Sequence, residues 1–221
     1  MTDKLCTLLE TGPDVATAAL ILAHGAGAAM TSPFLEAMAG LLAERAIKVV
    51  RFEFAYMAAR RDDGKKRPPP KAELLMPEYW AVLDRIVARA GRKPRIFIGG
   101  KSLGGRVASM IADDACAAGK INGVLALGYP FHPPGKLENL RTAHLTGLKA
   151  PMLIVQGDRD PFGTKAEVEA MALSPHIQIT WIGDGDHDLG PRGASGFTRK
   201  GNLRAAADAV AAFIEAAGTP R

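Results

Sequence analysis

The stretch GGKSLGG at residues 99–105 matches two motifs that serve different chemistries. Gly100-Lys101-Ser102 matches the end of the phosphate-binding loop G-x-x-x-x-G-K-[ST], whose backbone N–H groups surround phosphates. Gly100, Ser102 and Gly104 also match G-x-S-x-G, a sharp strand-to-helix turn that exposes a nucleophilic serine. The first motif predicts nucleotide binding, and the second predicts acyl chemistry through a covalent serine intermediate.

The surrounding residues favour the nucleophile turn. A phosphate-binding loop requires glycine where the chain has Arg95, and about four loop residues before its lysine. Here the apolar segment 95–98 leads almost directly into the motif. The nucleophile turn instead requires small residues two positions away on either side, and Gly100 and Gly104 meet that need. Lys101 is then the variable position of the motif, and we expect it to be a structural side chain.

A serine nucleophile needs a general base, and in such turns the chain order is serine, acid, histidine. Of the five histidines, His176 and His187 come last in the chain. His176 precedes the apolar segment 177–182, whereas His187 follows it and so belongs to the carboxyl edge of a parallel sheet, where working loops lie. We therefore predict His187 as the base for Ser102. The alternating Asp and Gly residues around it are typical of a turn, so we predict no metal site.

The acid is expected in the segment QGDRDPFG, which follows the apolar segment 152–155 and contains Asp158 and Asp160. We favour Asp160, because it follows Gly157 by three residues, where a loop leaving the sheet would turn back toward the site. The spacing alone does not decide between the two carboxylates.

An oxyanion hole needs two preorganised backbone N–H donors. One is expected at Leu103, directly after the nucleophile, and the other in the loop after an early strand. The segment LAHGAGAAM provides that loop, and we choose Ala26 as its donor. His24 in the same loop is expected to fix the backbone rather than to act as a base.

Apolar runs alternate with helical patterns along the chain. We predict strands at 4–9, 18–23, 48–54, 94–98, 121–127, 152–155 and 177–182. We predict helices at 33–46, 72–90, 103–118, 164–173 and 202–217. Apolar strands that alternate with helices indicate an α/β fold with a mostly parallel sheet covered on both faces. Residues 1–221 are expected to form a single domain, since single α/β domains reach this length.

Segments 54–71 and 128–150 are predicted to be loops that border the site. Neither is long enough to form a large cap domain, so we expect an open site for a small or mid-sized acyl substrate. The candidate substrate-binding residues in these segments are Tyr56, Met57, Tyr129 and Phe131.

The chain carries a net charge of +5, and much of the excess lies within residues 60–71. A basic patch raises nucleic acid as a partner, but Asp62 and Asp63 interrupt this run and no aromatic residue is interleaved with it. We expect a small-molecule substrate rather than nucleic acid, and we expect the basic segment to be either a solvated loop or a loop that steers an acidic substrate. The absence of a long apolar run predicts a cytoplasmic protein without a membrane span. Cys6 and Cys116 are expected to be free thiols.

Five segments together resemble the α/β-hydrolase superfamily: RFEFAYMAARR, GGKSLGGRVASM, LGYPFHPPGK with LRTAHL, QGDRDPFG and GDGDHDL. Within it, they resemble the branch related to dienelactone hydrolase that includes testis-expressed protein thirty and a scaffold subunit of a histone acetyltransferase complex. The resemblance spans nearly the whole chain and implies a triad of Ser102, Asp160 and His187, which favours Asp160 over Asp158. Dienelactone hydrolases proper have cysteine where this chain has Ser102, so lactone specificity is not implied.

The sequence thus predicts a serine hydrolase that acts on a carboxylic ester or thioester through an acyl-enzyme and needs no cofactor. Acyl transfer to an acceptor other than water would use the same residues. The alternative from a different class is a non-catalytic binding or scaffold module that retains the hydrolase architecture. The presence of every expected triad residue favours catalysis.

Overall fold

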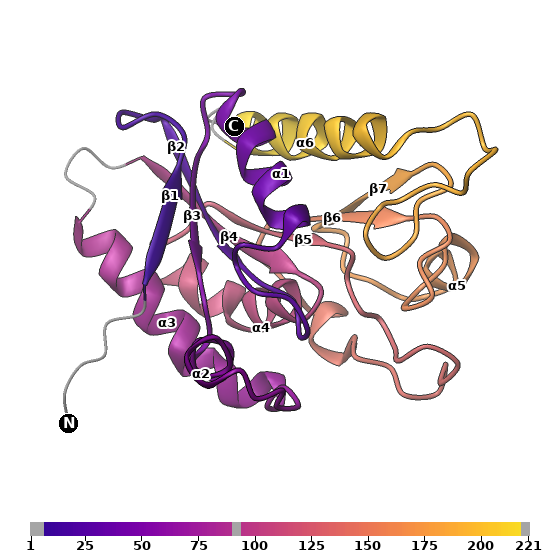
Figure 1. Ribbon diagram of the computed structural model, residues 1–221, viewed down its shortest axis with the longest axis horizontal. Coiled ribbons are helices and arrows are strands. Elements are labelled where there is room, and N and C mark those ends of the chain that lie inside the picture. Colours follow the sequence, from indigo (N-terminus) through magenta and orange to yellow (C-terminus); the bar gives the residue numbers. More distant parts are fainter. Residues whose placement is uncertain (1–6, 90–93, 218–221) are drawn as a thin grey trace.

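The computed structural model describes residues 7–89 and 94–217 of the chain. Within these ranges a seven-stranded sheet has the order β1-β3-β2-β4-β5-β6-β7 (Figure 1). β1 pairs antiparallel with β3, and all the other pairings are parallel. The strands are β1 (Leu8–Thr11), β2 (Ala18–Ala23), β3 (Lys48–Phe52), β4 (Arg95–Lys101), β5 (Gly123–Leu127), β6 (Met152–Gly157) and β7 (Ile177–Ile182).

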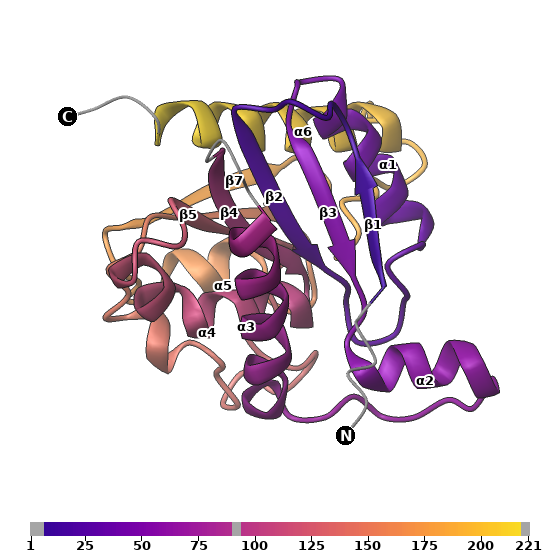
Figure 2. The same ribbon diagram turned by 90° about the vertical axis from the view of Figure 1, so that its left-hand side faces the viewer.

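Helices cover both faces of the sheet. They are α1 (Pro33–Ala43), α2 (Ala55–Asp63), α3 (Ala72–Arg89), α4 (Leu103–Ala117), α5 (Lys165–Glu169) and α6 (Arg199–Ala216), with a 3₁₀ turn η1 (Ala143–Leu145). α1 and α6 lie together on one face, and α3 and α4 lie on the other (Figures 1 and 2). The predicted α/β architecture with a mostly parallel sheet is confirmed, and no large cap domain is evident over the described residues. No helix in these ranges is both long and apolar enough to cross a membrane.

The composition of the central strands explains their place in the sheet. β2, β5 and β6 are buried along their whole length, with the sequences AALILA, GVLAL and MLIVQG. Side chains alternate between the faces, so that Ile21 packs with α3 and α4, whereas Leu20 and Leu22 pack with α1 and α6. A strand buried on both faces must be apolar at successive positions, as the sequence showed.

We predicted that segment 54–71 is a loop. The prediction is wrong for part of it, because residues Ala55–Asp63 form α2. The segment contains alanine, methionine and arginine, which favour helix, and the side chain of Met57 is buried. Gly64, with a φ of 70°, ends the helix in the left-handed conformation that glycine adopts readily. The charged run and the following prolines concealed this short helix.

Other element boundaries also differ from the predictions. α1 ends at Ala43, because the chain turns sharply at Ala46, whose φ is 57°. α5 covers five residues of the predicted 164–173, and a turn follows it in which the Met171 N–H donates to the carbonyl of Val168 at 3.0 Å. The first part of the predicted strand 4–9, the helix end at residue 90 and Cys6 lie outside the described residues.

The hydroxyl of Tyr79 ties α3 to the centre of the sheet. This fully buried oxygen lies 2.9 Å from the carbonyl of Ile21 in β2 and 2.7 Å from that of Gly99 in β4, and it accepts the Gly99 N–H at 2.9 Å. Glycine is required at position 99, because a Cβ there would lie 2.5 Å from the carbonyl oxygen of Leu125. Tyr79 therefore satisfies backbone groups in the strand that leads to Ser102.

We predict that Tyr79→Phe destabilises the protein by about 1–3 kcal/mol, because it leaves buried backbone groups without a partner. Urea unfolding would measure the change. Tyr56→Phe is the matched control and should be less destabilising, because the half-buried Tyr56 site admits water as a substitute partner. Equal stability of Tyr79→Phe and the wild type would contradict the prediction.

Candidate active site

Ser102 occupies a strained turn between β4 and α4. Its φ and ψ are 51° and −114°, a conformation that side-chain-bearing residues rarely adopt. A Cβ on Gly100 would lie 2.4 Å from the carbonyl carbon of Gly104, and a Cβ on Gly104 would lie 2.6 Å from the carbonyl oxygen of His24. The strand, turn and helix match the context that the G-x-S-x-G motif requires.

His187 and Asp160 are joined by a hydrogen bond of 2.8 Å between Nδ1 and Oδ2. Asp160 is fully buried, and its carboxylate also accepts hydrogen bonds from Gln156 Nε2 at 2.9 Å and from the Phe162 backbone N–H at 2.9 Å. Asp158 instead accepts the backbone N–H of Asp184 at 3.0 Å. The structure therefore brings Asp160, and not Asp158, to His187.

Gln156 was not among the predicted residues. Its side-chain amide also lies within hydrogen-bond distance of the carbonyls of Tyr129 and Gly163, and its oxygen accepts the Tyr129 N–H at 2.7 Å. A polar residue at the end of an apolar strand was the available sequence signal. Gln156 holds the carboxylate of Asp160 and the start of the segment after β5 in one arrangement.

Ser102 and His187 both lie beside the carboxyl end of β5. The Ser102 backbone N–H donates to the carbonyl of Leu127 at 3.1 Å. The next residue, Gly128, faces His187 so closely that a Cβ there would lie 3.3 Å from His187 Nδ1. The rings of His187 and Phe162 have centroids 4.3 Å apart, and Phe162 and Ser102 line the same cleft of about 530 Å³.

The Ser102 side chain makes no hydrogen bond with any residue that the structure describes. Contacts between a catalytic serine and its base often tighten only when substrate binds, so this geometry is compatible with a nucleophile and base pair.

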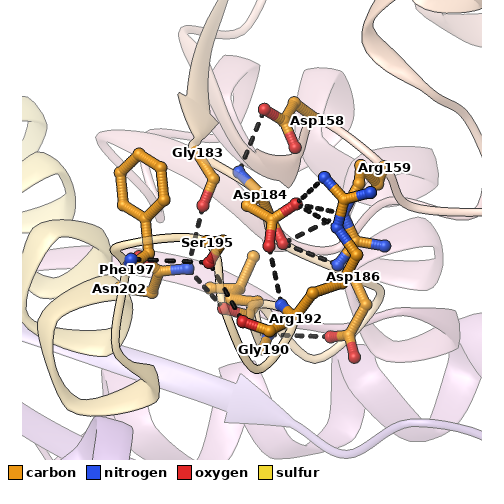
Figure 3. Close-up of polar contacts among 11 residues, drawn as sticks. Asp158, Arg159, Gly183, Asp184, Asp186, Gly190, Arg192, Ser195, Phe197 and Asn202 are labelled. Carbon is orange, nitrogen blue, oxygen red and sulfur yellow. Dashed lines mark hydrogen bonds and ion pairs between the residues drawn. The ribbon is translucent and has the colours of Figure 1, made fainter.

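The carboxylates of Asp184 and Asp186 hold the loop that carries His187, and Figure 3 shows their contacts. The Asp184 carboxylate accepts hydrogen bonds from the backbone N–H of Arg192 at 2.6 Å and from Arg192 Nε at 2.7 Å, and it forms an ion pair with Arg159 Nε at 2.7 Å. The hydrogen bonds from Arg192, with the nearby charge of Arg159, hold the pKa of Asp184 well below its usual range. Asp186 accepts the backbone N–H groups of Asp188 and Gly190 at 2.8 and 2.7 Å.

These contacts give Asp184 and Asp186 a structural function as turn residues. Among residues 7–89 and 94–217, no group of three His, Cys, Asp or Glu side chains is arranged to hold a metal ion.

Lys101, the variable residue of the motif, is buried beneath the His187 loop. Its Nζ lies 3.3 Å from Asp188 Oδ1 and 5.5 Å from the centre of the Phe34 ring. Burial lowers the pKa of Lys101, and the charges of Asp188 and Asp160 oppose that shift. Lys101 thus links the nucleophile turn to the loop of the base, which agrees with the structural side chain that we expected.

The two expected oxyanion donors, Ala26 and Leu103, line the same cleft as Ser102. Their backbone N–H groups donate no hydrogen bond to any residue in the described ranges. The Ala26 loop is held from behind, because the Tyr56 hydroxyl lies 3.2 Å from the Ala26 carbonyl and Arg60 Nη1 donates to the Gly27 carbonyl at 3.1 Å. Tyr56, which we expected to contact substrate, instead contacts this loop.

His24 supports the same loop. Its Nε2 accepts the Phe54 backbone N–H at 3.1 Å, so the ring proton belongs on Nδ1, which lies 2.6 Å from the Gly25 carbonyl. Burial lowers the pKa of His24 to about 4. A histidine that stays neutral and has both nitrogens engaged fixes the backbone, in agreement with the structural role that we expected.

Met57, Tyr129 and Phe131, which we expected to contact substrate, are not among the residues that line the cleft beside Ser102. Met57 is almost completely buried, and both aromatic side chains have no exposed surface. The rings of Tyr129 and Phe131 pack against each other with centroids 4.9 Å apart. Their segments fold back into the core, so the apolar side chains are used for packing rather than for contact with the cleft.

Other residues of the same segments line the cleft instead. Segments 54–71 and 128–150 border it as predicted, through Pro69, Pro70, Lys71, Pro130 and Arg141. α3 and α4 add Ala72, Glu73 and Arg106, which no sequence motif indicated. A second hollow, of about 630 Å³, lies between α1 and α6 and is lined by neither serine nor histidine.

A family model described as an α/β-hydrolase domain matches residues 16–215 of the chain. The chain belongs to this family. The match spans every strand from β2 to β7 and includes the nucleophile turn, the cleft and the His187 loop.

Solved structures share the fold of this α/β hydrolase. Dienelactone hydrolase from Anabaena variabilis has a TM-score of 0.74 at 19% identity, with 96% of this chain and 91% of that chain covered. Est1E from Butyrivibrio proteoclasticus, with ferulic acid bound, has a TM-score of 0.65 at 15% identity, with 96% and 94% covered. A serine hydrolase without a lid from Xanthomonas campestris has a TM-score of 0.63 at 18% identity, with 97% and 90% covered.

We predict that His24 makes this α/β hydrolase less stable as the pH falls from 7 to 5. The unfolded state binds a proton near the ordinary pKa of 6.5, whereas the folded state resists it until about pH 4. The free energy of unfolding therefore decreases as the pH falls, and at pH 5 this residue lowers it by about 2 kcal/mol. In His24→Gln this contribution is absent, so the decrease measured by urea unfolding at the two pH values should be smaller. An unchanged decrease would contradict the prediction.

Proposed function

We propose that this α/β hydrolase is a serine hydrolase that cleaves a small or mid-sized carboxylic ester or thioester through an acyl-enzyme. The observation that carries the proposal is the arrangement at the carboxyl end of β5. A serine in a strained, glycine-flanked turn lies beside a histidine that is oriented by a buried carboxylate. We assign the two as nucleophile and base, and their hydrogen bond would form when substrate binds.

In the proposed mechanism, Ser102 Oγ attacks the acyl carbonyl while His187 Nε2 takes its proton. Asp160 accepts a hydrogen bond from the Nδ1–H of His187. This bond leaves Nε2 free to take the proton and stabilises the imidazolium that forms. The N–H groups of Ala26 and Leu103 stabilise the oxyanion, each by about 3 kcal/mol of the barrier. His187 then protonates the leaving group, and an activated water molecule releases the acyl group from Ser102.

The proposal extends to finer features that rest on the sequence. We retain the resemblance to the branch that includes testis-expressed protein thirty, and the cytoplasmic location, as predictions. Residues 7–89 and 94–217 form no large cap domain over the cleft, which supports substrates that reach Ser102 from an open face.

We predict that a fluorophosphonate probe labels the wild-type protein and fails to label Ser102→Ala and His187→Ala. The probe reacts with a serine only when a neighbouring base activates it. Ser32→Ala and His176→Ala are matched controls, because Ser32 makes no side-chain cap contact and His176 lies at the opposite edge of the sheet. A folded wild-type protein that takes no label would favour the non-catalytic binding module over the hydrolase.

We predict that Asp160→Asn lowers kcat for a chromogenic ester by a factor on the order of 10⁴, because His187 loses the partner that sets its tautomer. Asp158→Asn should keep kcat within about tenfold of the wild type, because Asp158 contacts the backbone of Asp184 rather than His187. Steady-state kinetics of the two variants would measure the difference. A larger loss of kcat in Asp158→Asn than in Asp160→Asn would show that Asp160 is not the acid.

A further inference from the structure

We infer that the cleft beside Ser102 recognises a carboxylate on the substrate through the guanidinium groups of Arg141 and Arg106. This inference rests on the proposed hydrolase function and specifies its substrate class as acidic esters. Four charged residues line the cleft: Lys71, Arg106 and Arg141 are cationic, and Glu73 is anionic. The walls around the serine are therefore electropositive.

The backbone of Arg141 is fixed by hydrogen bonds, whereas its side chain has no partner among the described residues. Its backbone N–H donates to the Phe131 carbonyl at 2.7 Å, and its carbonyl accepts the Tyr129 hydroxyl at 3.0 Å. Its guanidinium forms no hydrogen bond or ion pair with a residue of the described ranges. Partial burial and the charge of Arg106 lower the pKa of Arg141. Two cations that repel each other without a shared anion indicate a ligand site rather than a stabilising contact.

Arg106 has spare capacity for an anion as well. Its Nη2 lies 3.1 Å from Glu73 Oε1, but its Nε is buried without a partner. A buried donor without an acceptor is unfavourable unless a ligand or water satisfies it. Arg106 also begins the hydrogen-bonding of α4, because its backbone N–H donates to the carbonyl of Ser102 at 3.0 Å. The guanidinium thus belongs to the same helical turn as the proposed nucleophile.

His144 adds no positive charge to this region. It lies 2.9 Å from Ser109 Oγ, and burial together with the charge of Arg106 lowers the pKa of His144 to about 4. The histidine stays neutral at pH 7, and Glu73 is the one carboxylate that lines the cleft. A carboxylate carried by the substrate would face two guanidinium groups and a single competing anion.

The basic segment 60–71, for which we expected either a solvated loop or the steering of an acidic substrate, contributes less to the cleft than its charge suggested. Arg60 donates to the Gly27 carbonyl, Arg61 pairs with Glu53 at 2.6 Å, and Arg67 pairs with Asp63. Lys71 is its one cation that lines the cleft. We therefore assign the selectivity for acidic substrates to Arg106 and Arg141, which were not among the predicted site residues.

A carboxylate suits this arrangement because its two oxygens match the paired N–H groups of a guanidinium. The test uses two pairs of esters that differ only in charge. In the first pair, mono-4-nitrophenyl glutarate and its methyl ester place the carboxylate, or its neutral form, on the acyl side. In the second pair, 4-carboxyphenyl butyrate and its methyl ester place it on the leaving group.

The readout is the ratio of kcat/KM for the acidic ester to that for the neutral ester, after subtraction of spontaneous hydrolysis. We expect a ratio above one for at least one pair in the wild type. The ratio for that pair should fall at least tenfold in Arg141→Met, mainly through KM, and recover in part in Arg141→Lys. Arg67→Met is the matched control and should keep the wild-type ratio, because Arg67 pairs with Asp63 outside the cleft.

Two results would overturn the inference while leaving the hydrolase function intact. One is a wild-type enzyme that cleaves both pairs with no preference for the acidic member. The other is an Arg141→Met variant whose ratio equals that of the wild type. A wild-type protein that cleaves no ester and takes no fluorophosphonate label would overturn the proposed function and, with it, the inference.

Discussion

The backbone turn at Ser102 is the constraint on which the rest of the site depends. A serine with a positive φ is energetically unfavourable and persists only where the surrounding structure holds it in place. The loop after β2, the end of β4 and the first turn of α4 meet there, and Gly100 and Gly104 leave no room for a Cβ. The strain is local, and the buried sheet on either side of it supplies the stability that maintains it.

Charged groups then fix the loops that the sheet delivers to this turn. Buried charges are tolerated when they are paired and hydrogen-bonded. Asp184 is satisfied by Arg159 and Arg192, and Asp160 by His187, Gln156 and the Phe162 backbone. The loop of the base is therefore held by paired charges and hydrogen bonds, together with the buried side chain of Leu189.

The fold and the site carry different kinds of information. Structures at 13 to 20% identity share this architecture, and they include a dienelactone hydrolase, an esterase domain and a monoacylglycerol lipase. An architecture shared by such different proteins does not identify a substrate. The substrate class must come from the side chains that line the cleft, and the charged ones in this chain are three cations, Lys71, Arg106 and Arg141, and one anion, Glu73.

Local pattern was sufficient for much of this protein. Apolar runs buried on both faces indicated the strands, and the glycines around Ser102 indicated a turn that no larger residue could form. The helix α2 was missed because a charged, proline-flanked segment resembles a loop until Met57 has a core to enter. Only the tertiary structure decided two points. Asp160 rather than Asp158 contacts His187. Arg141 lines the cleft, whereas Tyr129 and Phe131 do not. In both cases the residues compared are close in sequence, and the direction in which a loop side chain points depends on contacts with segments far away along the chain.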